Sequence, residues 1–76
     1  MNASRRKELK DVGGRLDCVR DLLVDIQIEE DMARDACPEN FQGNDQYRVS
    51  EEASEKIGKV IKQVSNAIDI IEELTS

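Results

Sequence analysis

Asp17, Asp21 and Asp25 have the residue type and the spacing that could do chemistry in this sequence. They recur every four residues, so a helix would place all three along its outer face. Such a row could hold a metal ion or imitate the charges of a nucleic acid. The chain has no histidine, and the second helix offers no companion cluster of glutamates. The aspartate row is therefore a poor metal site. We interpret it as a solvated helix face, with acidic mimicry as the alternative.

The residues that many enzymes use for acid–base and nucleophilic chemistry are missing from the chain. Without histidine, a Ser-His-Asp or Cys-His arrangement and a Cys₂His₂ zinc site cannot form. On a single helix, Cys18 and Cys37 would lie about 28 Å apart, far beyond the limit of roughly 7 Å between the Cα atoms of a disulfide. We expect two reduced thiols, with an intermolecular disulfide as the alternative. We predict a protein that is not an enzyme and has no catalytic residue, metal or cofactor.

The charge balance limits the class of partner. The chain carries 17 acidic and 11 basic residues, a net charge of -6. An acidic body repels phosphates, so direct binding of nucleic acid is not expected, although the basic residues at the start of the chain could touch one. No apolar run approaches the roughly 18–20 residues that span a bilayer. We therefore expect a soluble, cytoplasmic protein without a membrane segment.

Two long stretches have the hydrophobic period of paired helices. In each, apolar residues alternate at spacings of three and four, which is the seam pattern of a coiled coil. The pattern predicts a single all-α domain over residues 1–76, with one helix over about 4–36, a turn over about 37–44 and a second helix over about 45–75. The predicted helix–helix core consists of Leu9, Val12, Leu16, Val19, Leu23, Ile26, Ile57, Val60, Val64, Ile71 and Leu74.

The expected ends of the helices follow from capping residues. Ser4 or Asn2 is suited to cap the first helix, and Pro38 disfavours helical geometry at the residue before it. Asn44 and Ser50 are both reasonable caps for the second helix, and we favour Asn44. The pair Gly13-Gly14 predicts a local bend or fraying inside the first helix, since each glycine costs about 1 kcal/mol relative to alanine.

An antiparallel hairpin brings the two stripes into register. If facing residue numbers sum to 83, Val12 lies opposite Ile71 and Val19 opposite Val64, and six apolar layers match. The basic start of the first helix and the acidic end of the second each oppose their own helix dipole. In a hairpin these two ends are neighbours, so their opposite charges offset each other.

The chain carries more apolar surface than one seam would use. A ridge of apolar residues projects from the first helix on the side away from its stripe, and further residues flank the stripes. An exposed ridge of this kind usually marks a contact surface, although scattered surface hydrophobes are also common. We predict self-association, most simply a two-fold dimer that forms a four-helix bundle. The residues predicted for this contact are Leu22, Val24, Ile28, Met32, Ile61 and Ile68.

The connector around the predicted turn, residues 37–49, holds the only phenylalanine and the only tyrosine. Phe41 and Tyr47 either cap the apolar seam or present a recognition surface, and the cap is the preferred interpretation. Aromatic residues and arginines dominate binding hot spots, which supports the alternative. Together with the aspartate row, the residues considered for binding a partner are Asp17, Asp21, Asp25, Arg34, Phe41, Tyr47 and Arg48.

The turn also suggests a resemblance. Pro38-Glu39-Asn40-Phe41-Gln42-Gly43, a polar segment with Tyr47, and Glu-Glu-Ala at 51–53 resemble the small helical-hairpin proteins found in bacteriophages and prophages of Gram-positive bacteria. The resemblance covers about residues 15–74 and implies a small accessory protein of a mobile element that acts inside a bacterial cell. It carries over no catalytic or binding residue.

The expected function is non-enzymatic interaction with another protein. An acidic hairpin oligomer would bind and modulate a host or phage protein, and the resemblance suggests an inhibitor of a bacterial defence system as the sharper form. Two alternatives stay open. The chain could be a purely structural or antitoxin-like oligomer, or it could sequester a small anion at an oligomer interface.

Overall fold

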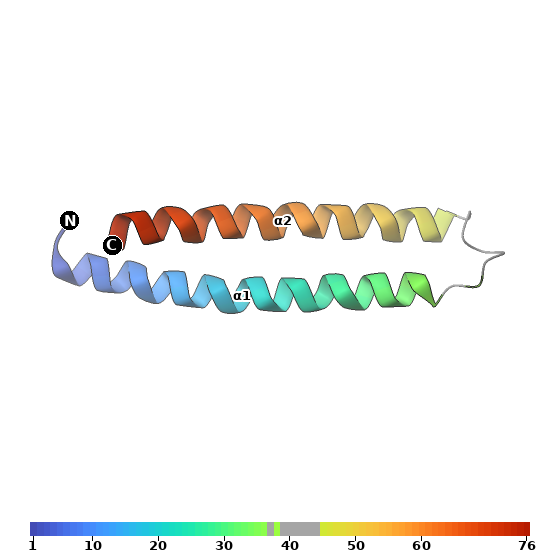
Figure 1. The fold of residues 1–76 in the computed structure, drawn as a ribbon, viewed down its shortest axis with the longest axis horizontal. Helices are drawn as coiled ribbons and strands as arrows, with labels where there is room; N and C mark the ends of the chain where they lie inside the picture. The colour runs from blue at the N-terminus through green and yellow to red at the C-terminus, as the bar shows by residue number, and fades with distance from the viewer. Residues whose placement is uncertain (37, 39–44) are drawn as a thin grey trace.

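The chain folds into two long helices that pack side by side and run in opposite directions (Figure 1). A computed structural model describes residues 1–36, 38 and 45–76. Helix α1 spans Ala3–Asp35 and helix α2 spans Asp45–Thr75. The molecule measures 60 × 14 × 13 Å, with both termini at one end. The prediction of an all-α antiparallel helical hairpin is confirmed.

Local sequence signals account for the start of α1. Asn2 is the N-cap, and its side-chain Oδ1 accepts a hydrogen bond of 2.8 Å from the backbone N–H of Arg5. The helix then continues through Gly13 and Gly14 without interruption and ends at Asp35. Helix α2 begins at Asp45, which matches the longer of the two predicted starts. The proposed cap Asn44 lies outside the described residues.

The seam between the helices is rotated from its predicted position. Five residues predicted for the core are exposed, with 43–52% of their surface free. In α1, the seam is instead built on Gly13, Arg20 and Gln27, which each come one residue after a predicted core residue and are spaced by seven. The other six predicted core residues are half-buried: Leu9, Leu16, Leu23, Ile57, Val64 and Ile71. The prediction was wrong for Val12, Val19, Ile26, Val60 and Leu74.

The physical reason for the rotation is that the residues one position after the predicted core residues of α1 let the two helices approach more closely and form hydrogen bonds. A Cβ atom built on Gly13 would lie 3.3 Å from Ile71 Cγ2, and one built on Gly58 would lie 3.2 Å from Gln27 Nε2. Ile71 therefore faces Gly13 and not Val12, which corrects the predicted register by one residue at this layer. Arg20 and Gln27 also reach hydrogen-bond partners on α2. Turning Val12, Val19 and Ile26 into the seam would break these contacts.

The hairpin has almost no core of its own. Among the described residues, Ile68 is the only buried apolar side chain, with 4% of its surface exposed. The other two buried residues, Ser54 and Thr75, are polar. A chain of this size has little margin against conformational entropy even with a full core. Two helices that bury one apolar side chain between them therefore need further contacts.

The two adjacent glycines provide a matched test of the seam. Apart from the neighbouring backbone of α1, no atom lies within 4 Å of a Cβ built on Gly14, whereas one built on Gly13 would lie 3.3 Å from Ile71 Cγ2. We expect Gly14→Ala to raise the free energy of unfolding by up to about 1 kcal/mol, because alanine is the better helix former. Gly13→Ala should gain less, since the new methyl group crowds Ile71. Urea denaturation followed by circular dichroism would measure both, and an equal gain would contradict the close approach at Gly13.

Candidate interaction surfaces

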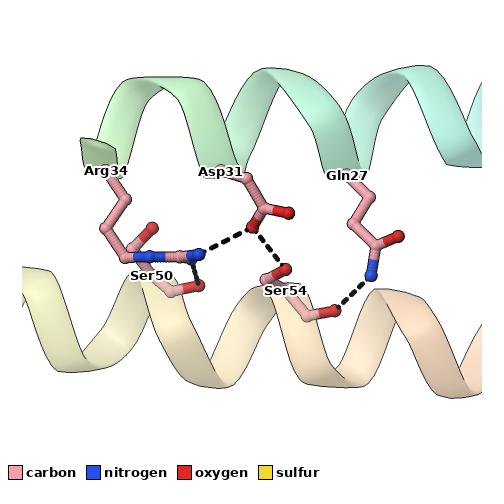
Figure 2. Close-up of polar contacts among 5 residues, drawn as sticks. All are labelled: Gln27, Asp31, Arg34, Ser50 and Ser54. Atoms are coloured by element: carbon pink, nitrogen blue, oxygen red, sulfur yellow. Dashed lines mark hydrogen bonds and ion pairs between the residues drawn. The ribbon is translucent and has the colours of Figure 1, made fainter. Parts of the chain in front are cut away.

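Near the turn, five residues tie the two helices together (Figure 2). Arg34 Nη2 donates to Asp31 Oδ1 at 2.9 Å, and Arg34 Nη1 donates to the backbone oxygen of Ser50 at 3.3 Å. The Ser54 hydroxyl donates to the same Asp31 oxygen at 2.6 Å. Gln27 Nε2 donates to the backbone oxygen of Ser54 at 3.0 Å. We call these contacts the turn-end tie, which joins three side chains of α1 to two residues of α2.

The tie changes the acidity of both charged partners. The hydrogen bond from Ser54 lowers the pKa of Asp31 below its ordinary value of 3.8; partial desolvation opposes this shift, and the hydrogen bond and charge of Arg34 add to it. Desolvation lowers the pKa of Arg34, but the hydrogen bond and charge of Asp31, with Tyr47 and Asp35, outweigh it and raise that pKa. Both side chains are therefore held in their charged forms.

A second, weaker tie lies closer to the middle of the hairpin. Arg20 Nη2 forms an ion pair of 2.7 Å with Asp17, and Arg20 Nη1 donates to the Ser65 hydroxyl at 3.4 Å. Arg20, Gln27 and Arg34 are spaced by seven residues, so each returns to the same side of α1. Polar contacts at such positions fix rotation and register more than they add stability. They explain why the apolar stripe of α1 is turned partly out of the seam.

The side of the hairpin that carries these ties is charged. Lys10 and Asp17 of α1 and Glu72 of α2 surround one hollow, whose lining also includes Ile68 and Ile71. Near the turn, a second hollow is lined in part by Arg34, Asp35, Tyr47, Glu51 and Glu55. Both hollows take residues from the two helices. We call this side the charged face.

The opposite side is apolar. Val12, Val19 and Ile26 each come one residue before a seam position of α1. On α2, the buried or half-buried residues Ser54, Ile61, Ile68 and Thr75 are preceded in the same way by Ala53, Val60, Ala67 and Leu74. In two right-handed helices that run antiparallel, a step back along each chain turns toward the same side of the pair. These stripes therefore form one surface, which we call the apolar face. It comprises Leu9, Val12, Leu16, Val19, Leu23, Ile26, Ala53, Ile57, Val60, Val64, Ala67, Ile71 and Leu74.

The structure divides the residues predicted for self-association. Ile68 is buried in the seam, so the prediction that it lies on an outer contact surface was wrong, whereas Val24 and Ile61 are half-buried. The physical reason is the rotation of the helices, which turns Ile68 inward. Leu22, Ile28 and Met32 are exposed as expected, with 62%, 49% and 65% of their surface free.

The residues considered for partner binding are also dispersed. Asp17 is paired with Arg20, and Arg48 is paired with Asp45 at 2.6 Å. Arg34 belongs to the turn-end tie, and only 16% of its side chain is exposed. Tyr47 is half-buried and lines the same hollow as Arg34. Asp21 and Asp25 are exposed, and Phe41 lies outside the described residues.

The row of aspartates is thereby interrupted at Asp17, whose carboxylate is neutralised by an arginine. No group of three or more Cys, Asp or Glu side chains within residues 1–36, 38 and 45–76 is placed to hold a metal ion. In the same part of the chain, neither helix is long and apolar enough to cross a membrane. Cys18 is exposed and unbonded.

Sequence reasoning missed the contribution of Arg20, Gln27 and Ser54 to the seam. The signal was the series Gly13, Arg20, Gln27 and Arg34 at intervals of seven, which has the period of a seam but lacks apolar residues. Comparison with family models, curated proteins and solved structures finds no match to this chain.

Proposed function

We propose that the chain is a non-enzymatic protein–protein interaction module, an acidic helical hairpin that works as an oligomer and binds and modulates another protein. One observation carries the proposal: the apolar face presents an uncharged surface from both helices, while the seam buries only Ile68 among the described apolar residues. Contiguous exposed apolar surface of this extent is typical of contact sites between proteins.

The charged surfaces suggest how a further partner would be recognised. The chain has a net charge of -6, and Asp21 and Asp25 are exposed on α1. Rows of like charge steer partners of the opposite charge and add specificity more than affinity. The partner would therefore present a basic surface. The resemblance to hairpin proteins of phages and prophages makes this partner a host or phage protein, with a component of a bacterial defence system as the sharper form.

Cross-linking in bacterial cells, with Val19→Asp compared against Ile28→Asp, tests the proposal. Val19 and Ile28 are apolar residues of α1 with similar exposure, 43% and 49%, but only Val19 lies on the apolar face. We expect the wild type and Ile28→Asp to form an adduct with a further protein, and Val19→Asp to lose it. The adduct should then be reconstituted from the two purified proteins.

Salt dependence of the reconstituted complex tests the role of the acidic surfaces. We expect binding to weaken steeply as the salt concentration rises, because exposed charges are screened. If the wild type, Val19→Asp and Ile28→Asp gave the same adducts in cells, or no adduct with another protein, the binding of a further protein that depends on the apolar face would be contradicted.

A further inference from the structure

We propose that the apolar face is covered by a second copy of this chain, face to face, so that two hairpins form a four-helix bundle. The inference rests on the proposed interaction function and names the partner of that face. It differs from the dimer expected from the sequence, because the contact uses the side of Val19 and Val60 and leaves Ile28 and Met32 outside.

The exposed area of the hairpin matches the requirement of a stable dimer. The chain exposes 5867 Å², whereas a folded monomer of 8.6 kDa exposes about 4,700 Å². Two copies that cover this excess would bury about 2,300 Å² in total, within the range of roughly 2,000–5,000 Å² found for obligate homodimers. One further helix could not cover a two-helix face along its whole length, but a second hairpin has the required width.

The apolar face is complementary to itself. Within its length, from Leu9 to Ile26 on α1 and from Ala53 to Leu74 on α2, its residues carry no charge. A two-fold interface uses the same patch on both subunits, so a wholly uncharged patch meets no unpaired charge. The face also alternates large and small side chains, since Ala53 and Ala67 interrupt the valines and leucines, which allows two such faces to interlock.

The edges of the face fit the same partner. The edge positions lie three residues after the central residues of the face, which are Val12, Val19 and Ile26 on α1 and Ala53, Val60 and Ala67 on α2. They hold Arg15, Leu22 and Glu29 on α1 and Lys56, Gln63 and Ile70 on α2. Charges of both signs are present, so two copies do not repel each other along these edges. Leu22 and Ile70, which are 62% and 57% exposed in the hairpin, would be partly covered there.

Sedimentation equilibrium of the full chain under reducing conditions tests the inference. We expect the mass of two chains at micromolar concentration. Val60→Asp should raise the dissociation constant at least about 100-fold, because it places an unpaired charge in an apolar interface. Ile28→Asp, an exposed site off the face, should leave the dissociation constant unchanged. A monomer throughout the concentration range would overturn the inference.

Thiol reactivity gives a second test that does not depend on a disruptive variant. In a chain with Cys18→Ser and Cys37→Ser, the variant Val19→Cys places a thiol on the apolar face with little change in volume. We expect it to react at least about tenfold more slowly than Cys18 does in a chain with Cys37→Ser, since Cys18 points away from the face. Equal rates would overturn the inference.

These results separate the inference from the proposed function. A chain that forms the dimer but yields no adduct with another protein in cells contradicts only the binding of a further partner. A monomeric chain that still binds another protein through Val19 contradicts only the identity of the partner that covers the face.

Discussion

Ile68→Asp is expected to abolish the helical structure of the chain. Ile68 is the only buried apolar side chain among the described residues, with 4% of its surface exposed. Truncating a buried isoleucine to alanine typically costs about 2–5 kcal/mol, and burying an unpaired carboxylate costs more. Small domains have a margin of only a few kcal/mol, so the loss exceeds what the hairpin can absorb. Far-UV circular dichroism at 25 °C would measure the helix content.

Ile28→Asp is the matched control for this prediction. Ile28 is also an isoleucine in the middle of a long helix, but 49% of its surface is exposed and it lies outside the seam and the apolar face. The same substitution there should change helix content little, since surface substitutions usually fall within about 0.5 kcal/mol. If Ile68→Asp retained full helicity, the seam described here would be contradicted.

Asp31→Ala is expected to produce the second largest loss of stability. The Ser54 hydroxyl is buried and donates its hydrogen bond to Asp31 at 2.6 Å. Removing the carboxylate leaves this hydroxyl without its acceptor and leaves Arg34 without its ion pair. An unsatisfied buried hydroxyl costs about 1–3 kcal/mol. Urea denaturation at pH 7 would measure the change, and Asp17→Ala should cost less because its partner Arg20 is more exposed.

The same carboxylate should make stability depend on pH. The folded state lowers the pKa of Asp31 from 3.8, so its contribution to stability is fully present above that ordinary value. It is lost as the pH falls through the lower folded-state value. Asp31→Asn cannot titrate, so the difference in unfolding free energy between the wild type and this variant should shrink as the pH falls from 5 toward 2. A constant difference would contradict the lowered pKa.

The helices themselves could be predicted from local signals. The period of apolar residues, the capping residues and Pro38 placed both helices within one residue of their observed bounds. The rotation of the helices could not be predicted from apolar residues alone. Val12 and Gly13 are neighbours, and hydrophobicity favours the valine in the seam. The structure places Gly13 there because its small size lets Ile71 approach.

Polar seam residues account for the other error. Arg20, Gln27 and Arg34 are residues that usually face solvent, and Ser54 offers no hydrophobic gain, so none of them was predicted to join the helices. Their contacts become evident only when donors on α1 and acceptors on α2 are placed together. The sequence did indicate more apolar surface than one seam uses. Which residues form that surface depended on the rotation.

The dependence of thermal stability on protein concentration tests most directly whether the hairpin needs a second copy to cover its apolar face. When folding is coupled to association, the midpoint of thermal unfolding rises with concentration. We predict a steady rise between about 1 μM and about 1 mM chain under reducing conditions. A midpoint that is the same across this range would show that the hairpin is stable alone and would contradict the covered apolar face.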